Sequence, residues 1–346
     1  MKQERNFTMT LASSIGILLV VFGHSGFEEP DVMFHLKGLH RWIYSFHMPL
    51  FIFVSGYLYA LTNPDFFKVE IGKFIKKKFL RLAVPYLVLG VIVFCIKYLF
   101  ASISHVEREF SLSNFLLMFI APDIKSSTIG YLWFIATLFF MFCVVSILPL
   151  FRLDLRKPQI ALAVMAICWT LKYAAPDILL FKINALLWYL PFFISGILFN
   201  VYEQKLTKYI NGNYAQTILY LIVSVLGCLY LKIDNKLLSF CSDIILGYIG
   251  ILLSFSVCNT ILRYCNNKLP SCWLNVLTRS FTIYLLSWFP QYVTKFVVVN
   301  ILHLHWSICV LSMFTAGIVV PLGIYWLLDK YLDFNKHKLL KLCIGA

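Results

Sequence analysis

The chain has 346 residues, of which 60% are hydrophobic, 17% aromatic and 13% charged, and its mean hydropathy is +0.81. Ordinary soluble domains have roughly 45–50% apolar and 25% charged residues, so this composition excludes a soluble globular protein and an intrinsically disordered one. The formal net charge is +14, but no basic recognition helix lies outside the apolar segments, which argues against nucleic acid as a partner. Lipid is the expected environment.

Apolar runs recur along the whole chain at lengths that suit a bilayer about 30 Å thick. We therefore predict an all-α polytopic transmembrane helical bundle, forming one domain over residues 1–346, with about ten spans. The short first and fifth runs and Pro290 in the ninth leave nine or eleven crossings open. The predicted spans are residues 8–23, 42–62, 82–102, 129–150, 158–173, 183–202, 214–231, 238–260, 273–293 and 304–328.

A cleaved signal peptide is an alternative interpretation of the first apolar run. Lys2 and Arg5 precede it, as in a signal peptide, but Thr10, Ser13 and Ser14 interrupt the apolar region. No small-x-small cleavage motif follows. We expect a retained span.

The positive charges indicate how the bundle is oriented. With the N-terminus in the cytoplasm, the inner segments carry about twice as many Lys and Arg residues as the outer ones. Both termini are therefore predicted to be cytoplasmic. The densest basic block is then also cytoplasmic, and anchoring against anionic lipid is one interpretation of it. This block contains Lys73, Lys76, Lys77, Lys78 and Arg81.

Metal binding and disulfide formation are not expected. The ten cysteines are scattered, mostly inside apolar runs, with no CxxC pair and no metal-ligand spacing. His303 and His305 resemble half of a metal site, but no third ligand is near them in sequence, and an outer loop is the simpler interpretation. Asp243 and Arg279 are charges inside spans, yet the topology places them toward opposite sides, which argues against an ion pair between them.

Two histidines near the front of the chain are expected at similar depth. His24 ends the first span, and His47 lies about 7–8 Å below the outer end of the second by helical rise. Burial keeps an imidazole neutral and able to accept a proton near pH 7, so the two could form a general-base pair. Alternatively, each is an interfacial histidine bonded to a loop carbonyl. Glu28, Glu29 and Asp31 could orient His24 or form a solvated loop.

The first two spans carry the most distinctive sequence. Residues 14–24 read SIGILLVVFGH, and residues 42–58 read WIYSFHMPLFIFVSGYL. Both segments strongly resemble the opening of the acyltransferase 3 family of integral membrane O-acyltransferases. The FHMPLF and SGYL segments are most similar to its fucose 4-O-acetylase-related branch, which modifies sugars of surface polysaccharides and lipo-oligosaccharides. Further similarity lies in residues 78–82, 85–86, 131–134, 191–196 and 283–286.

The resemblance implies an enzyme of the bacterial inner membrane that transfers an acyl group, usually acetyl, from cytoplasmic acyl-CoA to a carbohydrate hydroxyl. His24 corresponds to the family's essential first-span histidine. The family usually has arginine 11 residues earlier, where this chain has Ser13. Lys2, Arg5 or the basic block would then have to supply the missing charge. A ninth-span position that often holds histidine is Ser287 here.

Acyl transfer to an alcohol needs a base, stabilisation of an oxyanion and a site for the polyanionic donor. We assign His24 as the base, acting on the hydroxyl directly or through a transient acyl-imidazole, with His47 as its helper. The basic block is the expected site for the phosphates of the donor, acetyl-CoA or another acyl-CoA. The donor-binding candidates are Lys76, Lys77, Lys78 and Arg81.

This assignment requires a channel, because His24 is expected toward the outer side and the donor binds inside. The pantetheine arm spans that separation only if the helices enclose a path for it. Candidate lining residues are Ser13, Ser55, Tyr57 and Trp133, although ordinary helix packing explains each of them equally well.

Two other functions remain open at this point. Ten spans with polar residues at one level also describe a transporter or flippase for a lipid-linked saccharide. A noncatalytic sensor or scaffold is the third alternative, and Ser13 and Ser287 favour it. For the enzyme, the expected partners are acyl-CoA, a carbohydrate acceptor and membrane lipid, with no permanently bound cofactor.

Overall fold

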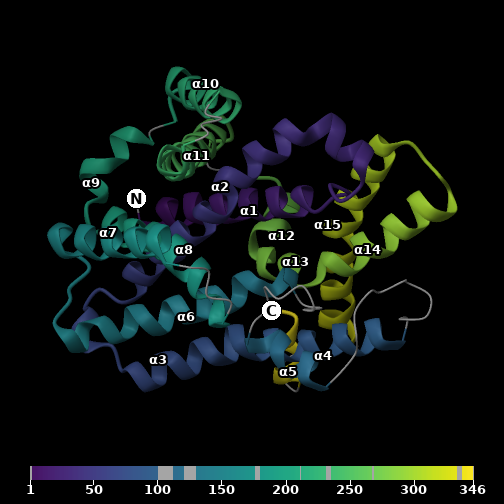
Figure 1. The fold of residues 1–346 in the computed structure, drawn as a ribbon, viewed down its shortest axis with the longest axis horizontal. Coiled ribbons are helices and arrows are strands. Elements are labelled where there is room, and N and C mark those ends of the chain that lie inside the picture. Colours follow the sequence, from purple (N-terminus) through teal and green to yellow (C-terminus); the bar gives the residue numbers. More distant parts are fainter. Residues whose placement is uncertain are drawn as a thin grey trace.

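Two long helices, α1 (Lys2–Gly23) and α2 (Pro30–Thr62), lie side by side through the middle of the molecule, and the other helices pack around them (Figure 1). The structure is a computed structural model. It describes residues 2–99, 112–120, 130–175, 180–210, 212–230, 235–266, 269–332 and 337–345.

The connection between α1 and α2 is a tight turn encoded by glycine and proline. Gly26 has a left-handed backbone (φ +82°) and packs against Cys309 and Met313 of a distant helix, so a side chain there would be strained. Pro30 occupies the start of α2, where its missing N–H has no helical partner, and Asp31 lies in the positive first turn. These features place His24, directly after α1, inside the turn.

All secondary structure in the described ranges is helical, including several 3₁₀ turns and two π-helical segments, η2 and η7. The remaining elements are η1 (Phe66–Lys68), α3 (Ile71–Lys78), η2 (Phe79–Ala83), α4 (Val84–Leu99), α5 (Leu112–Ile120), η3 (Gly130–Leu132), α6 (Trp133–Ile147), η4 (Leu148–Phe151), α7 (Pro158–Ala174), η5 (Leu180–Lys182), α8 (Ile183–Val201), α9 (Glu203–Leu206), η6 (Thr207–Tyr209), α10 (Tyr214–Tyr230), α11 (Lys236–Tyr264), α12 (Ser271–Thr278), α13 (Ser280–Leu286), α14 (Trp288–Lys295), η7 (Phe296–Ile301), α15 (Trp306–Tyr331) and α16 (Lys338–Cys343).

The all-helical membrane architecture predicted from the sequence is confirmed. Among the described residues, six helical stretches are long and apolar enough to cross a membrane, and the bent pair of residues 203–209 with 214–230 would make a seventh. Residues 7–23 and 158–174 form shorter apolar helices. The count of about ten spans and the cytoplasmic placement of both termini stay predictions.

Several predicted spans differ from the helices in their boundaries. The predicted span 42–62 starts twelve residues too late, because His35, Lys37 and other polar residues lower the hydropathy of the first turns of α2. The predicted span 273–293 is divided among α12, α13 and α14. The predicted spans 82–102, 129–150 and 214–231 each extend beyond the described residues at one end.

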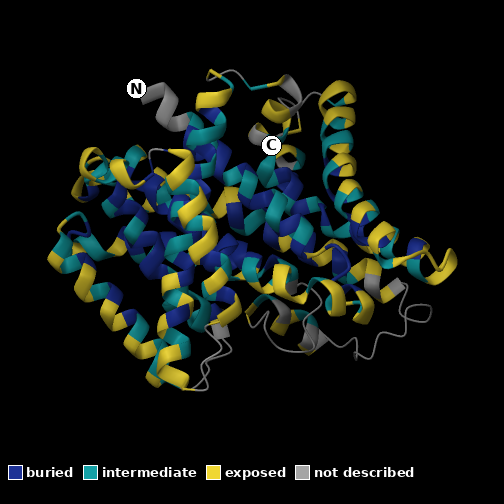
Figure 2. Ribbon diagram, turned by 90° about the horizontal axis from the view of Figure 1, so that it is seen from above, coloured by how far each residue is buried: buried dark blue, intermediate teal, exposed yellow. Residues whose placement is uncertain are grey.

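Burial is concentrated on the central helices. Seen from above, the dark blue residues gather in the interior, and the peripheral helices carry yellow outward faces (Figure 2). Helix α2 packs against α1, α8, α10 and α11. At its crossing with α8 the backbones approach closely, because Gly56 faces the Phe193 carbonyl and Gly196 faces the Phe53 carbonyl. This close packing of small residues is a common way for helices to associate in lipid.

We predict that Gly56→Ala destabilises the protein and that Gly38→Ala, on the same helix, does not. A Cβ at Gly56 would overlap the backbone of Phe193, whereas a Cβ at Gly38 meets nothing within 4 Å. Overpacking of this kind costs about 1–3 kcal/mol, and alanine in an open helical position gains up to about 1 kcal/mol. Thermal unfolding of the two purified variants, followed by tryptophan fluorescence, measures the difference. Equal midpoints would contradict the importance of this crossing.

Candidate functional site

The C-terminal end of α1 is held by side chains from two other helices. Gln291 of α14, which is buried, donates hydrogen bonds to the Val21 carbonyl (2.7 Å) and to Ser25 Oγ (3.1 Å). Tyr44 of α2 donates its hydroxyl hydrogen to the Gly23 carbonyl (3.2 Å). These bonds satisfy carbonyls that the end of a helix leaves without partners. The backbone that carries His24 is therefore fixed from both sides.

Three histidines surround one tyrosine at this turn. The ring of Tyr44 stacks on His40 with centroids 3.9 Å apart, meets His47 edge-on at 4.7 Å and meets His24 edge-on at 6.4 Å. We refer to His24, His40, Tyr44 and His47 as the histidine cluster. The sequence-based expectation that His24 and His47 lie at similar depth agrees with this geometry.

The hydrogen bond of His47 determines which of its ring nitrogens carries the hydrogen. His47 is buried, and its Nδ1 lies 2.9 Å from the Ile43 carbonyl on the preceding turn of α2. A carbonyl only accepts, so Nδ1 carries the hydrogen, and in the neutral ring Nε2 is the unprotonated nitrogen. His47 is thus bonded to its own helix and not to a loop carbonyl.

His24 is exposed at the turn that follows α1, although protein atoms lie around its ring. Desolvation by the surrounding protein lowers the pKa of the His24 imidazole from its ordinary value of 6.5; Glu28 opposes this effect, and His40 adds to it. A neutral imidazole that borders a space has the properties of a general base.

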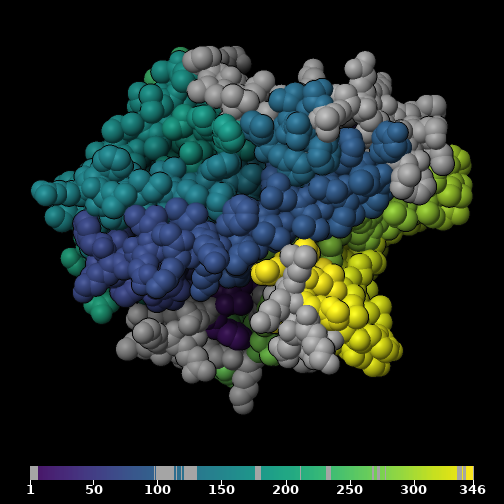
Figure 3. All heavy atoms as spheres, turned by 90° about the horizontal axis from the view of Figure 1, so that it is seen from below, coloured from purple at the N-terminus to yellow at the C-terminus, as the bar shows by residue number. Residues whose placement is uncertain are grey.

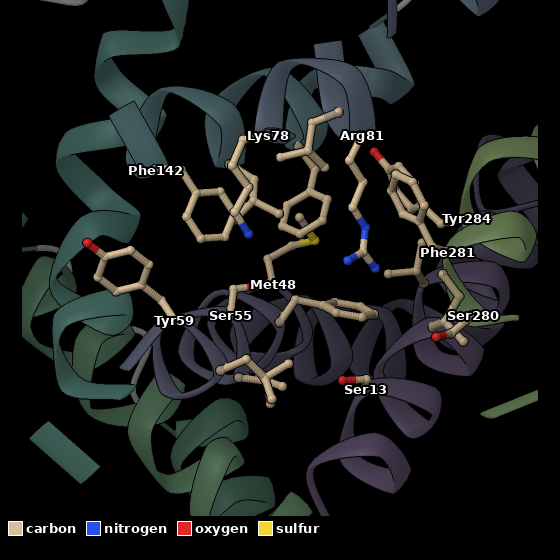
Figure 4. A pocket seen from close by; sticks show the side chains of 18 of the residues that line it. Ser13, Met48, Ser55, Tyr59, Lys78, Arg81, Phe142, Ser280, Phe281 and Tyr284 are labelled. Atoms are coloured by element: carbon tan, nitrogen blue, oxygen red, sulfur yellow. The ribbon is translucent and has the colours of Figure 1, made fainter. Parts of the chain in front are cut away.

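A cavity of about 330 Å³ begins one turn of α1 before His24 and is enclosed by α1, α2, α3, η2, α6 and α13; we call it the central cavity. Its wall includes Val20, one turn before His24, and Met48, directly after His47. Lys78 and Arg81 point into it from the side opposite Ser13 and Ser55 (Figure 4). Most of the other wall is apolar. Two cations at one end of an apolar cavity suit a ligand with a long apolar part and an anionic end.

Within the central cavity, Lys78 is held by aromatic rings. Its ammonium lies 3.7 Å from the centroid of Phe142 and 5.3 Å from that of Phe74. The buried hydroxyl of Tyr59, which also lines the cavity, has no hydrogen-bond partner in the described part of the chain. Such a group is available to a bound molecule.

A second cavity, of about 580 Å³, adjoins the first at Arg81, which lines both; we call it the basic cavity. Lys77, Arg81 and Arg279 contribute three positive charges to its wall. Seen from below, α1 (purple) is visible in an opening between the blue residues that include α3 and the yellow C-terminal residues (Figure 3). Leu342 and Gly345 near the C-terminus line the basic cavity opposite Lys77.

Two buried polar atoms at the basic cavity lack partners within the described residues: Arg279 Nε and Thr282 Oγ1. The Arg279 guanidinium also stacks over Tyr325 at 4.3 Å and donates to Asn275 Oδ1 at 2.7 Å, so its orientation is fixed. Orphaned donors beside three cations suit an anion with several oxygens, such as a phosphate.

A third cavity, of about 490 Å³, adjoins the histidine cluster; we call it the aromatic cavity. His40 and Tyr44 form part of its wall. Trp188 and Tyr189 of α8 supply aromatic surface. Arg41 of α2 and Asp243 of α11 supply opposite charges, and the charge of Arg41 acts on the Asp243 carboxylate. The side chains of both are exposed.

Some of the site residues predicted from the sequence line the cavities, and others do not. Lys77, Lys78 and Arg81 line the central or basic cavity, as do Ser13 and Ser55. The others line none of the three cavities described above. Lys76 is exposed, the Tyr57 hydroxyl donates to Glu203 (3.3 Å), and Trp133 stacks on Tyr189 at 5.6 Å, behind the wall of the aromatic cavity.

The remaining polar candidates have structural partners. Lys295 pairs with Glu28 (3.1 Å) and Glu29 (2.9 Å), which ties the turn after His24 to α14. His305 caps α15 by accepting from the Ser307 N–H. Among the described residues, no group of three or more His, Cys, Asp or Glu side chains could hold a metal ion. Arg279 and Asp243 belong to different cavities, in agreement with the expectation that they form no ion pair.

Sequence reasoning missed His40, Tyr44 and the contribution of Arg279. One face of α2 carries His40, Tyr44 and His47 at the i, i+4, i+7 spacing of a helix. The predicted span begins at residue 42 and therefore leaves out His40, the first residue of this pattern. Arg279 joins the basic cavity only through tertiary packing.

The sequence from residue 11 to residue 327 matches the family of the acyltransferase domain, acyltransferase 3. Searches of curated proteins and of solved structures found no match. The family match covers more than half of the chain, including residues 11–23 of α1 and all of α2 with the histidine cluster. The chain belongs to the acyltransferase 3 family.

Proposed function

We propose that this protein transfers an acetyl or other short acyl group from acyl-CoA to a hydroxyl of a cell-surface polysaccharide or lipid-linked sugar. The observation that carries the proposal is the position of His24, which is exposed one helical turn beyond a cavity whose wall carries Lys78 and Arg81. The similarity of the first two spans to the fucose 4-O-acetylase-related branch supports O-acetylation of a sugar. It also supports a location in the bacterial inner membrane.

The two adjoining cavities suit the two parts of the donor. The phosphates of acyl-CoA bind in the basic cavity, where Lys77, Arg81 and Arg279 neutralise them. The pantetheine arm enters the central cavity past Lys78 and Arg81 and directs the thioester toward the histidine cluster. In this proposal the two cavities together form the path that the distance between the basic block and His24 requires.

His24 serves as the base. In direct transfer, its neutral imidazole takes the proton of the acceptor hydroxyl while the oxygen attacks the thioester carbonyl. The carbon–sulfur bond breaks, and the thiolate of coenzyme A takes the proton from the imidazolium. In a relay, the imidazole nitrogen attacks the thioester carbonyl first and the thiolate leaves. The hydroxyl oxygen then attacks the acyl-imidazole, the acyl carbon–nitrogen bond breaks, and the hydroxyl proton passes to the thiolate, which leaves the imidazole neutral again. His47 contacts the ring of Tyr44 and helps to position the other residues of the histidine cluster.

We predict that His24→Ala abolishes acyl transfer while the protein still folds. Loss of a general base lowers rates by about 10²- to 10⁴-fold, and loss of a nucleophile in the relay lowers them at least as much. The measurement follows radiolabel from acetyl-CoA to saccharides of the host's surface glycan in lipid nanodiscs. The thermal midpoint of the variant is the control for folding. Label transfer at the wild-type rate, or sugar translocation by the wild type without any label transfer, would contradict the proposal.

The activity should decline on the acid side with a midpoint below pH 6.5. Only the neutral His24 accepts a proton, and because desolvation lowers its pKa, activity is full near pH 7 and is lost as pH falls through the lowered pKa. Glu28 raises this pKa, so Glu28→Gln should move the midpoint of the kcat/KM profile further down. A midpoint above 6.5, or a profile that Glu28→Gln leaves in place, would argue against His24 as the titrating base.

The donor site predicts a selective effect on KM. Arg81→Gln and Arg279→Gln should each raise the KM for acetyl-CoA about tenfold or more, because each removes charged hydrogen bonds worth about 1.5–3 kcal/mol, and leave the KM for the acceptor nearly unchanged. Lys76→Gln is the matched control, since Lys76 is exposed and lines neither donor cavity. An equal rise for both substrates, or an equal effect of Lys76→Gln, would assign the basic residues to membrane topology instead.

A further inference from the structure

The aromatic cavity has the chemistry of a sugar-binding site. Trp188 and Tyr189 are half-buried, so their rings keep surface that a ligand can cover. The apolar face of a pyranose ring packs well on such rings. Arg41 offers hydrogen-bond donors and Asp243 offers acceptors, and sugar hydroxyls use both.

The polar wall of the aromatic cavity includes an ionisable residue, Asp243, from an apolar helix. Asp243 lies in α11, one of the helices apolar enough to span the membrane. An ionisable group in such a helix is costly in lipid and is normally directed toward a partner or a water-filled space. Asp243 has such a partner, because the charge of Arg41 acts on it, and both residues line the aromatic cavity.

Charge distinguishes the aromatic cavity from the donor cavities. The basic cavity presents Lys77, Arg81 and Arg279, which suits a polyanion. The aromatic cavity combines one cation with one carboxylate, and a carboxylate repels the phosphates of acyl-CoA. The aromatic cavity therefore favours an uncharged, hydroxyl-rich ligand over the donor.

The two ligands would meet at the histidine cluster. His40 and Tyr44 line the aromatic cavity, and the Tyr44 ring contacts His24 and His47. The central cavity approaches the same cluster from Val20 and Met48. A sugar in the aromatic cavity would place a hydroxyl on one side of the cluster while the thioester approaches from the other.

We propose that the aromatic cavity is the acceptor site, that it binds a neutral hexose or deoxyhexose unit of the glycan, and that Trp188 and Asp243 determine its affinity. This inference rests on the proposed function. It adds the place and the chemical class of the acceptor.

The test measures sugar binding without requiring catalysis. The probes are the methyl glycosides of glucose, galactose, fucose and rhamnose, and saturation-transfer NMR reports their binding to the full chain in lipid nanodiscs. Sugar-headed detergents are left out because they would compete. We expect saturation transfer to at least one glycoside in the wild type and at least a fivefold weaker signal in both Trp188→Ala and Asp243→Asn. Trp326→Ala is the control, because Trp326 is exposed on α15 and lines none of the three cavities described above.

Binding of radiolabelled acetyl-CoA to the same samples separates the possible failures. Unchanged acetyl-CoA binding in Trp188→Ala and Asp243→Asn, together with lost glycoside binding, supports the acceptor site. Glycoside signals equal to those of the wild type in both variants, or no glycoside signal in the wild type, overturn it. An equal loss of acetyl-CoA binding also overturns it, since the cavity would then serve the donor or the fold. Glycoside binding in a wild type that transfers no acetyl group would contradict the proposed function and leave the sugar site standing.

Discussion

The geometry of the site depends on the contact between Tyr44 and the end of α1. The Tyr44 hydroxyl satisfies the Gly23 carbonyl, and the Tyr44 ring contacts all three histidines of the cluster. Since Tyr44 belongs to α2, which is packed between α1, α8 and α11, it moves little relative to the core. His24 follows the last residue of α1 and would otherwise lie on a short loop. The tyrosine joins this loop residue to a rigid helix, which is how a precise constellation is best supported.

The cavities near the cluster differ in charge. The central and basic cavities combine an apolar wall with Lys77, Lys78, Arg81 and Arg279. The aromatic cavity balances Arg41 with Asp243. A membrane enzyme that takes a polyanionic donor and an uncharged acceptor needs such a division, because each site then disfavours the wrong substrate as well as binding the right one.

The sequence predicted those parts of the molecule that local patterns determine. Helical architecture and the similar depth of His24 and His47 follow from hydropathy and spacing, and the structure agrees. Helix α2 begins before the predicted span, where exposed polar residues such as His35 and Lys37 lower the hydropathy of its first turns. His40 lies in this part of the helix, outside the predicted span. Arg279, between α12 and α13, joins Lys77 of α3 in one cavity through tertiary packing, which no local pattern encodes.

Ser13 illustrates how tertiary packing can compensate for a missing local signal. The family usually has arginine at this position, but the Ser13 hydroxyl only donates back to the Met9 carbonyl of its own helix (3.0 Å). Arg81 enters the same cavity from the opposite wall, within the π-helical segment η2 (Figure 4), a type of irregularity that often occurs at functional sites. A cation is thus present in the cavity although the first span lacks one. Since anion binding depends on where the charge lies and not on which helix carries it, the absence of arginine at position 13 is no argument against a donor site.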